Sequence, residues 1–232
     1  MRVKAIGRFG FQASYNMVYS PTGALIAASN GSSLNREIQL LDATTGRLVV
    51  MFPGALGLPP AFSPDERTVA TSSPGASSDS ITLWGVESGQ EFGRLEGKGI
   101  RLAFSPDGRL IAGSPLEYDS DGGFVSGIYR GIALWDVATR EKIATFGGDD
   151  RLTSLVFSPD GATLASSSGD GGAITLWDVA TRREVATLAG SASLVLFGPT
   201  VRFSPAVAVA PSSSGMSRLA RRSPRSRDTR TP

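Results

Sequence analysis

The sequence contains no cysteine and no histidine among its 232 residues. Without cysteine the chain has no disulfide, no thiolate nucleophile and no cysteine-ligated zinc. Without histidine it lacks the usual general base near neutral pH and the commonest metal ligand. These absences argue against most catalytic and metal sites, and we expect no cofactor, no catalytic residue and no metal.

Long apolar runs are also missing. No run reaches the roughly 18 residues that a membrane-spanning helix needs. Residues 1–10 contain three basic side chains but no apolar core of a secretory signal. We therefore expect a cytoplasmic protein.

Basic residues are distributed unevenly. Residues 211–232 contain six arginines and one acid, whereas the rest of the chain is mildly acidic. The Arg/Ser/Pro-rich composition predicts a disordered tail. Arginines can bind phosphate backbones without sequence preference, but this tail has no aromatic residue on which a base could stack. We therefore expect nucleic acid as a partner only through the tail, if at all.

Two sequence marks recur together along the chain. The first is an aromatic residue followed by Ser-Pro, and its prolines are Pro21, Pro64, Pro106, Pro159 and Pro205. The second follows about twenty residues later, at Leu41, Trp84, Trp135 and Trp177. The prolines are 43, 42, 53 and 46 residues apart, and the second marks are 43, 51 and 42 apart. A period near 40–45 residues is typical of propeller blades, at about that length each.

The fourth unit shows how one repeat folds. Its apolar run at 155–157 leads into Ser158-Pro159-Asp160-Gly161, a sequence that favours a tight turn. Three further strands are predicted at 163–167, 174–177 and 183–188. Asp178 is placed to accept backbone N–H groups in the loop between the last two strands. Four antiparallel strands per repeat make a propeller blade.

The other units repeat this order, and the same heptapeptide occurs at 134–140 and 176–182. We therefore predict an all-β protein, a β-propeller of four-stranded antiparallel blades. The array is expected over 14–205, with residues 1–13 as a possible closing strand. The expected blades span about 14–52, 58–95, 99–146 and 151–188, with a partial fifth at 191–210.

From about Ser14 to Leu188 these units resemble the WD-repeat β-propeller family. The resemblance rests on the Phe-Ser-Pro-Asp-Gly turn followed about twenty residues later by Leu-Trp-Asp. It implies that each tryptophan lies in the third strand, packed within its blade, and that the next aspartate caps the loop to the fourth strand. The structural positions of the repeat are Trp84, Trp135, Trp177, Asp136, Asp178, Pro64, Pro106 and Pro159.

The chain departs from the family pattern at several positions. The family's Gly-His pair before the first strand is missing, so its Asp–His–Ser–Trp network is expected only in part, from Asp170, Ser166 and Trp177. Leu41 replaces one tryptophan and Gly85 replaces one aspartate. We expect these changes to reduce blade rigidity rather than activity.

The resembled family most often closes its ring with seven blades, which would need about 290 residues at this repeat length. Four units are too few for such a ring. We therefore expect an incomplete or open ring of four blades plus a partial fifth. The ends of an open array leave unpaired strand edges and a bare apolar blade face. Self-association through these ends is an expected consequence.

The fifth unit begins with Phe203-Ser204-Pro205 and then continues as Ala-Val-Ala-Val-Ala at 206–210. Loss of one base from codons for Asp-Gly-Arg-Arg-Arg gives this peptide. We therefore hypothesise a frameshift near Ala206, with a natural truncation or a genuine arginine-rich tail as alternatives. Reading the flanking DNA in all frames tests this, because a frameshift predicts repeat-like peptides downstream.

The longest excursion lies in unit three, where Pro106 and Trp135 are 29 residues apart, against 18 to 20 in the other units. The excess lies in the loop 115–130, on the face opposite the Ser-Pro turns. Its mixture of aromatic residues and arginine is typical of interaction surfaces. The candidate partner-binding residues are Tyr118, Asp119, Asp121, Phe124, Tyr129 and Arg130. The alternative is a tolerated surface insertion, and the acids lack the further ligands of a calcium loop.

These observations predict a non-catalytic scaffold that presents loops to protein partners. The alternative is an accessory or sensor propeller of a larger enzyme or signalling protein encoded elsewhere. The sequence has neither a Gly-x-Ser-x-Gly elbow nor a glycine-rich phosphate loop. A decayed or misread gene product without a function of its own is the third interpretation.

Overall fold

A computed structural model describes residues 14–30, 37–53, 58–73, 80–97, 99–115, 130–168, 173–188, 192–197 and 207–211. All regular elements among these residues are β-strands. No helix in the described ranges is long and apolar enough to cross a membrane.

Strands β1 to β15 form four blades of four strands, because β12 belongs to two blades, and blades three and four together make one seven-stranded sheet. Blade one consists of β1 (Ser14–Tyr19), β2 (Leu25–Asn30), β3 (Glu37–Asp42) and β4 (Leu48–Pro53). Blade two consists of β5 (Ala61–Phe62), β6 (Thr68–Ser73), β7 (Ser80–Gly85) and β8 (Glu91–Glu96). Blade three contains β9 (Gly99–Phe104), β10 (Leu110–Pro115), β11 (Arg130–Asp136) and the first part of β12 (Lys142–Phe157). Blade four contains the rest of β12 with β13 (Thr163–Ser168), β14 (Ile174–Asp178) and β15 (Glu184–Leu188).

Every strand pairs antiparallel with the next strand along the chain inside its blade. The long strand β12 serves two blades. Residues 142–151 pair with β11, and residues 152–157 pair with β13. The outermost strand of blade three therefore continues directly into the innermost strand of blade four.

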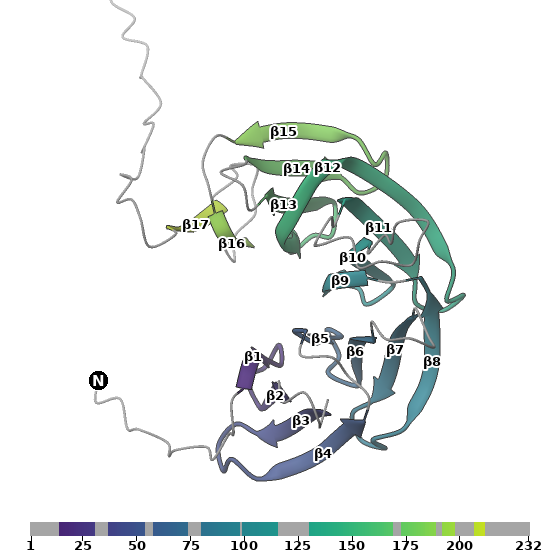
Figure 1. The fold of residues 1–232 in the computed structure, drawn as a ribbon, viewed down its shortest axis with the longest axis vertical. Helices are drawn as coiled ribbons and strands as arrows, with labels where there is room; N and C mark the ends of the chain where they lie inside the picture. The colour runs from purple at the N-terminus through teal and green to yellow at the C-terminus, as the bar shows by residue number, and fades with distance from the viewer. Residues whose placement is uncertain are drawn as a thin grey trace, which may run out of the picture.

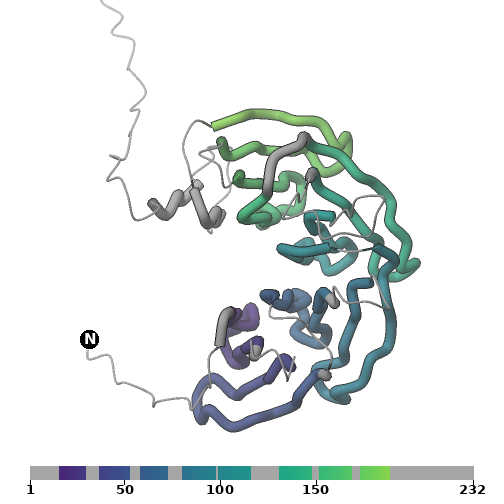
Figure 2. Tube along the Cα trace, in the orientation of Figure 1, coloured from purple at the N-terminus to yellow at the C-terminus, as the bar shows by residue number. Residues whose placement is uncertain are grey.

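The blades follow one another along an arc (Figure 1). The first strand of each blade lies toward the inside of the arc, and β4, β8 and β15 lie on the outer circumference (Figures 1 and 2). Two further strands, β16 (Ala192–Phe197) and β17 (Val207–Pro211), pair with each other, and β16 lies against β12 and β13. Among the described strands no sheet closes the ring between β1 and β17. The prediction of an open array of four-stranded antiparallel blades is confirmed.

The start of the fifth unit differs from the prediction. Its first strand, β16, ends at Phe197 rather than at Phe203, and Phe197 pairs with Val207. The apolar run that begins at Val207 thus takes the place of a second strand, and Pro211, predicted to begin the tail, ends β17. The predicted closing strand within 1–13 and the tail 212–232 lie outside the described residues.

The core lies between the blades. Trp84 of blade two clusters with Ile38, Leu40 and Phe52 of blade one, and the rings of Phe52 and Trp84 are 5.2 Å apart. Trp135 clusters with residues of blade two in the same way, and Trp177 meets the ring of Phe146 at 5.5 Å.

Each tryptophan lies in a third strand and packs against its own blade, as Trp84 does on Phe62 and Val69. In addition, its ring covers the preceding blade, which the sequence did not predict. Neighbouring blades pack face to face, so the face of one blade that carries the tryptophan is buried against the preceding blade.

Candidate functional site

In every blade a Ser-Pro turn connects the first strand to the second. In each turn the serine hydroxyl accepts the N–H of the residue five positions later, at 2.9 to 3.0 Å, from Leu25, Thr68, Leu110 and Thr163. In blades two to four the same hydroxyl donates to the aspartate two positions on, at 2.5 to 2.6 Å. The positive φ that closes the turn falls on Gly23, Glu66, Gly108 and Gly161. Three of these four residues are glycine, which adopts this conformation without strain.

The loops between the third and fourth strands lie at the same end of the blade, beside the Ser-Pro turns. Asp136 accepts the N–H groups of Ala138 and Thr139 at 2.9 and 2.8 Å, and Asp178 accepts that of Thr181 at 2.7 Å. The predicted capping by both aspartates is thus present, and Asp42 does the same in blade one. In blade two, where Gly85 stands at this position, the aspartate cap is missing. The hydroxyl of Ser88 still accepts the N–H of Gln90, as the threonines at this position do in blades one and three.

The two sets of loops lie on one face of the arc, as the strand order predicts. Backbone hydrogen bonds of 2.8 to 3.0 Å join them in every blade. Neighbouring blades also contact each other here. The Glu66 carboxylate accepts the N–H of Thr22, and the Pro64 ring lies next to Gly108. We call this surface, made of the turns at 20–25, 63–68, 105–110 and 158–163 with the loops that follow the third strands, the turn face.

The carboxylates of the turn face are held ionised by the turns themselves. The Ser63, Ser105 and Ser158 hydroxyls lower the pKa of Asp65, Asp107 and Asp160, respectively, below the ordinary value of 3.8. In the other loops the Thr45 and Thr181 hydroxyls lower the pKa of Asp42 and Asp178, and the Thr139 N–H lowers that of Asp136. Asp65 and Glu66, which are adjacent in the sequence, accept hydrogen bonds in different turns.

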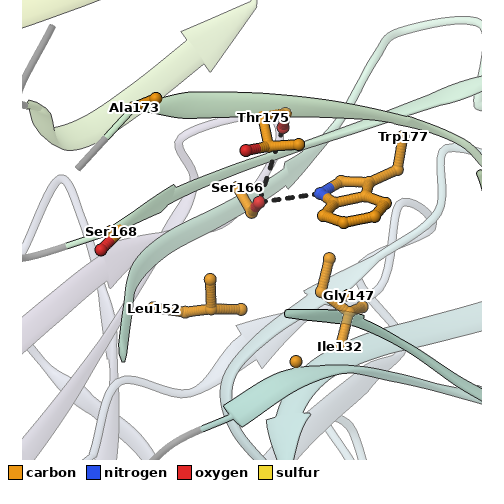
Figure 3. Close-up of a pocket in the computed structure, with 9 residues that line it drawn as sticks. Ile132, Gly147, Leu152, Ser166, Ser168, Ala173, Thr175 and Trp177 are labelled. Carbon is orange, nitrogen blue, oxygen red and sulfur yellow. Dashed lines mark hydrogen bonds between the residues drawn. The ribbon is translucent and has the colours of Figure 1, made fainter. Parts of the chain in front are cut away.

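The tryptophan N–H groups show what remains of the expected network. Trp177 donates to the Ser166 hydroxyl at 2.9 Å, as predicted, and that hydroxyl donates to the Thr175 carbonyl at 3.5 Å (Figure 3). Asp170, the third predicted member, lies outside the described residues. Trp84 donates to Thr71, whereas Trp135 donates to the carbonyl of Glu96 in blade two at 2.7 Å.

A small pocket lies beside Trp177, between blades three and four. Its wall includes Leu152, Gly147 and Ile132 on one side and Ser166 and Thr175 on the other (Figure 3). Its volume of about 20 Å³ matches the roughly 10–15 Å³ that one water needs rather than the space of an organic ligand. Across the described ranges, no group of three or more acidic side chains is placed to hold a metal ion.

Of the predicted partner-binding loop, only Arg130 is described, at the start of β11. Tyr118, Asp119, Asp121, Phe124 and Tyr129 lie outside the described residues. The loop's two ends are fixed, because β10 ends at Pro115 and the buried Ser114 hydroxyl donates to the Gly131 carbonyl at 3.3 Å.

Four-stranded antiparallel blades in an arc, with their turns tied on one face, define an incomplete β-propeller. Residues 140–178 match the WD40 family, described as "WD domain, G-beta repeat", so this stretch of the chain is a WD40 repeat. The match runs from β12 to the end of β14 and thus includes the strand shared by two blades.

Among solved structures, the chain is similar to a chain of Kuenenia stuttgartiensis hydrazine synthase, with 20% sequence identity and a TM-score of 0.62. The similarity covers 86% of this chain and 55% of that chain, so the present chain spans about half of it. At this identity the similarity shows the fold alone. No curated protein matches the sequence.

Proposed function

We propose that the chain is a non-catalytic scaffold that binds other proteins. The observation that carries this proposal is the WD40 repeat at 140–178 within an array of blades, because WD40 domains generally mediate protein–protein interaction. Support also comes from the turn face, where serine, threonine and aspartate side chains are engaged in holding the backbone. A rigid scaffold of this kind presents loops at little entropic cost on binding.

The loop between Pro115 and Arg130 is the proposed partner-binding segment. It leaves and re-enters blade three at two strands that the Ser114–Gly131 hydrogen bond ties together. Its two ends, Pro115 at the end of β10 and Arg130 at the start of β11, lie at the strand ends opposite the turn face. Aromatic residues and arginine are the side chains that most often dominate binding energy at protein interfaces.

Affinity capture on the immobilised full chain, followed by binding measurements with each purified partner, tests the proposal. We expect the double variant Tyr118→Ala/Phe124→Ala to weaken binding at least about tenfold, as loss of interface aromatics does. Thr187→Ala, at an exposed position of β15, is the control and should bind like wild type. A purified partner that binds both variants equally would refute the role of the loop, and the absence of any direct binder would refute the scaffold.

An accessory propeller of a larger enzyme is the second candidate. The observation that favours it is the similarity in fold to a chain of an enzyme, hydrazine synthase. In that case a captured partner is itself an enzyme, and adding this chain changes its rate or its substrate KM. A partner whose kinetics do not respond supports the simple scaffold.

Self-association through an open end of the array is part of the same proposal. Its support is the group of large apolar side chains that blade one exposes.

A further inference from the structure

The first strands of the four blades carry almost no charge. These strands are β1, β5, β9 and residues 152–157 of β12, and they lie toward the inside of the arc (Figure 1). Among the described residues of these strands, Arg101 in β9 is the one that is charged. A lone charge in such surroundings calls for a partner, because charges taken out of water are normally paired.

The backbone at Arg101 is strained. Arg101 and Leu102 of β9 lie opposite Gly113 alone, so the strand contains a β-bulge. Arg101 has a φ of 56°, in the left-handed region that favours glycine at the first position of such a bulge. A Cβ on Gly113 would lie 2.8 Å from the Leu102 side chain, so the opposite strand leaves room for the bulge. Bulges re-aim side chains, and strained residues cluster at binding sites.

The guanidinium of Arg101 has no partner among the described residues. Its Nε is fully buried without a hydrogen-bond acceptor, and no hydrogen bond or ion pair in the described ranges involves the side chain. The residue as a whole is only partly buried, and Nε is its one fully buried nitrogen. The two Nη groups are therefore left to bind a ligand. Thr153, at the corresponding bulge of blade four, differs because its hydroxyl donates to the Ser167 carbonyl at 3.2 Å.

Arg101 lies beside the base of the partner-binding loop. Ile100 pairs with Ser114, and Gly99 pairs with Pro115, where β10 ends and the loop begins. The Ser114 hydroxyl also donates to the carbonyl of Gly131, at the other end of the loop. The strained arginine is therefore held by paired strands at the point from which the loop leaves the blade, and strands position a binding group more precisely than loops do.

We propose that Arg101 binds a carboxylate group, the side chain of an aspartate or glutamate of the protein partner. This deepens the scaffold function and rests on it for the source of the carboxylate. A guanidinium presents two parallel N–H groups that match the two oxygens of a carboxylate. One carboxylate also neutralises the one positive charge, whereas a phosphate dianion would leave a negative charge on these uncharged strands. The bound carboxylate accounts for an arginine where glycine would be unstrained.

Nuclear magnetic resonance of the full chain tests the carboxylate site without a known partner. The buried Nε–H of Arg101 should exchange slowly with water, and its signal is assigned by its loss in Arg101→Gln. The probe is N-acetyl-glutamate amide, a capped glutamate, which should shift this signal in a saturable way. Capped glutamine at the same ionic strength should not. Equal shifts from both probes, no shift, or tighter binding of inorganic phosphate than of capped glutamate would each overturn the assignment.

Arg101→Gly removes the guanidinium and leaves a residue that adopts the bulge without strain, so the fold should be kept. Followed on the backbone amide signals of Leu102 and Ser114, its binding of capped glutamate should be lost. Arg182→Gly is the matched control, because Arg182 has a similar φ of 61° and is exposed in the loop between β14 and β15. It loses the same charge and the same strain but should bind like wild type. Equal loss of binding in both variants would mean that the probe responds to overall charge.

A purified partner from affinity capture tests the source of the carboxylate. We expect Arg101→Gly to raise its dissociation constant at least about 30-fold, as truncation of one member of a buried charge pair does. Arg101→Lys should recover only part of the affinity, because an ammonium lacks the planar fork. Capped glutamate should compete with the partner for wild type.

A partner that binds Arg101→Gly as tightly as wild type would refute the protein source of the carboxylate, while the loop variant Tyr118→Ala/Phe124→Ala still tests the scaffold on its own. The absence of any partner would overturn both the scaffold and the protein source. Saturable binding of capped glutamate would in that case identify a site for a free carboxylate instead.

Discussion

Gly23 stands at the one position of the first turn where the backbone must take a positive φ, here 77°. A Cβ added there would meet no atom within 4 Å. Gly23→Ala therefore isolates the cost of the left-handed conformation, and we expect it to lower the free energy of unfolding by roughly 1–2 kcal/mol. For a chain of this size that is a fall in Tm of about 2–4 °C per kcal/mol. A thermal melt measures it, and an unchanged Tm would show that the turn does not need glycine.

The indole N–H of Trp84 donates to the buried hydroxyl of Thr71 at 2.9 Å. Thr71→Val keeps the shape and removes the acceptor, so we expect a loss of about 1–3 kcal/mol from the unsatisfied indole N–H. In the Trp84→Phe background the same substitution should cost less, because no donor is left unpaired. A double-mutant cycle by urea denaturation measures the difference, and equal costs in both backgrounds would contradict a role for this bond.

The sequence predicted the tryptophans in the third strands and Ser166 as a partner of Trp177, but not the partners of the other two indole N–H groups. The partner depends on which residue of the second strand lies beside the indole. Thr71 and Ser166 supply a hydroxyl at that position, but Gly113 does not, and Trp135 reaches the Glu96 carbonyl instead. Strand register decides this, and register becomes visible only in the paired sheet.

At the scale of the element, β11 and β12 approach each other closely where the chain passes between blades. Gly131 has a φ of 73°, and a Cβ there would lie 2.8 Å from the carbonyl oxygen of Phe146. Gly131→Ala therefore adds a backbone clash to the conformational strain that Gly23→Ala also carries. We expect it to cost about 1–3 kcal/mol more than Gly23→Ala, as overpacking does. Paired urea denaturation curves test the order, and equal costs would mean that the strands move apart freely.

The turns make the stability depend on acid pH. The serine hydroxyls hold the pKa of Asp65, Asp107 and Asp160 below the ordinary 3.8 that an unfolded chain would show. A depressed pKa in the folded state stabilises the protein above the unfolded value, and this stability is lost as the pH falls through the folded value. We therefore expect Tm to vary little above about pH 5 and to fall progressively below about pH 4.

Asp107→Asn keeps an acceptor for the Ser105 hydroxyl and removes the ionisation. It should lower Tm at neutral pH and reduce the fall at acid pH, because its turn no longer releases stability on protonation. Glu141→Gln, on an exposed side chain, is the control. An acid-induced fall that is the same in Asp107→Asn and wild type would show that the turn carboxylates do not carry it.

Most strands could be predicted because turn chemistry marks their ends. Each Ser-Pro turn fixed where a first strand stops, and the structure places β2, β6, β10 and β13 directly after these turns. The fifth unit lacked that guidance, because Phe203-Ser204-Pro205 follows the end of β16 at Phe197 instead of bordering it. The continuity of β12 was not predicted either, since no turn residue distinguishes a bend between blades from an ordinary loop.

At the scale of the molecule, the sequence predicted the number of blades and the open array, but not that each tryptophan also contacts the preceding blade. Periodicity counts the repeats, yet it does not say which of two neighbours a side chain faces. Arg101 went unnoticed because the bulge that holds it is visible only once β9 is paired with β10. Its signal in the sequence was a charge in a first strand, where the other three blades have none.

The packing of one blade on the next is what holds the array together, and Phe52 tests it. Phe52 is fully buried between blades one and two, with its ring 5.2 Å from that of Trp84. Phe52→Ala should lower the free energy of unfolding by about 3–5 kcal/mol and expose the indole to solvent, since truncation of a buried phenylalanine leaves a cavity. Phe92, on the outer edge of blade two and 47% exposed, undergoes the same truncation with little loss of burial. Phe92→Ala should therefore change stability by no more than about 0.5 kcal/mol. Thermal melts with acrylamide quenching of the tryptophans distinguish the two variants. If Phe52→Ala costs no more than Phe92→Ala, the blades are held by their own strand pairing rather than by contact with their neighbours.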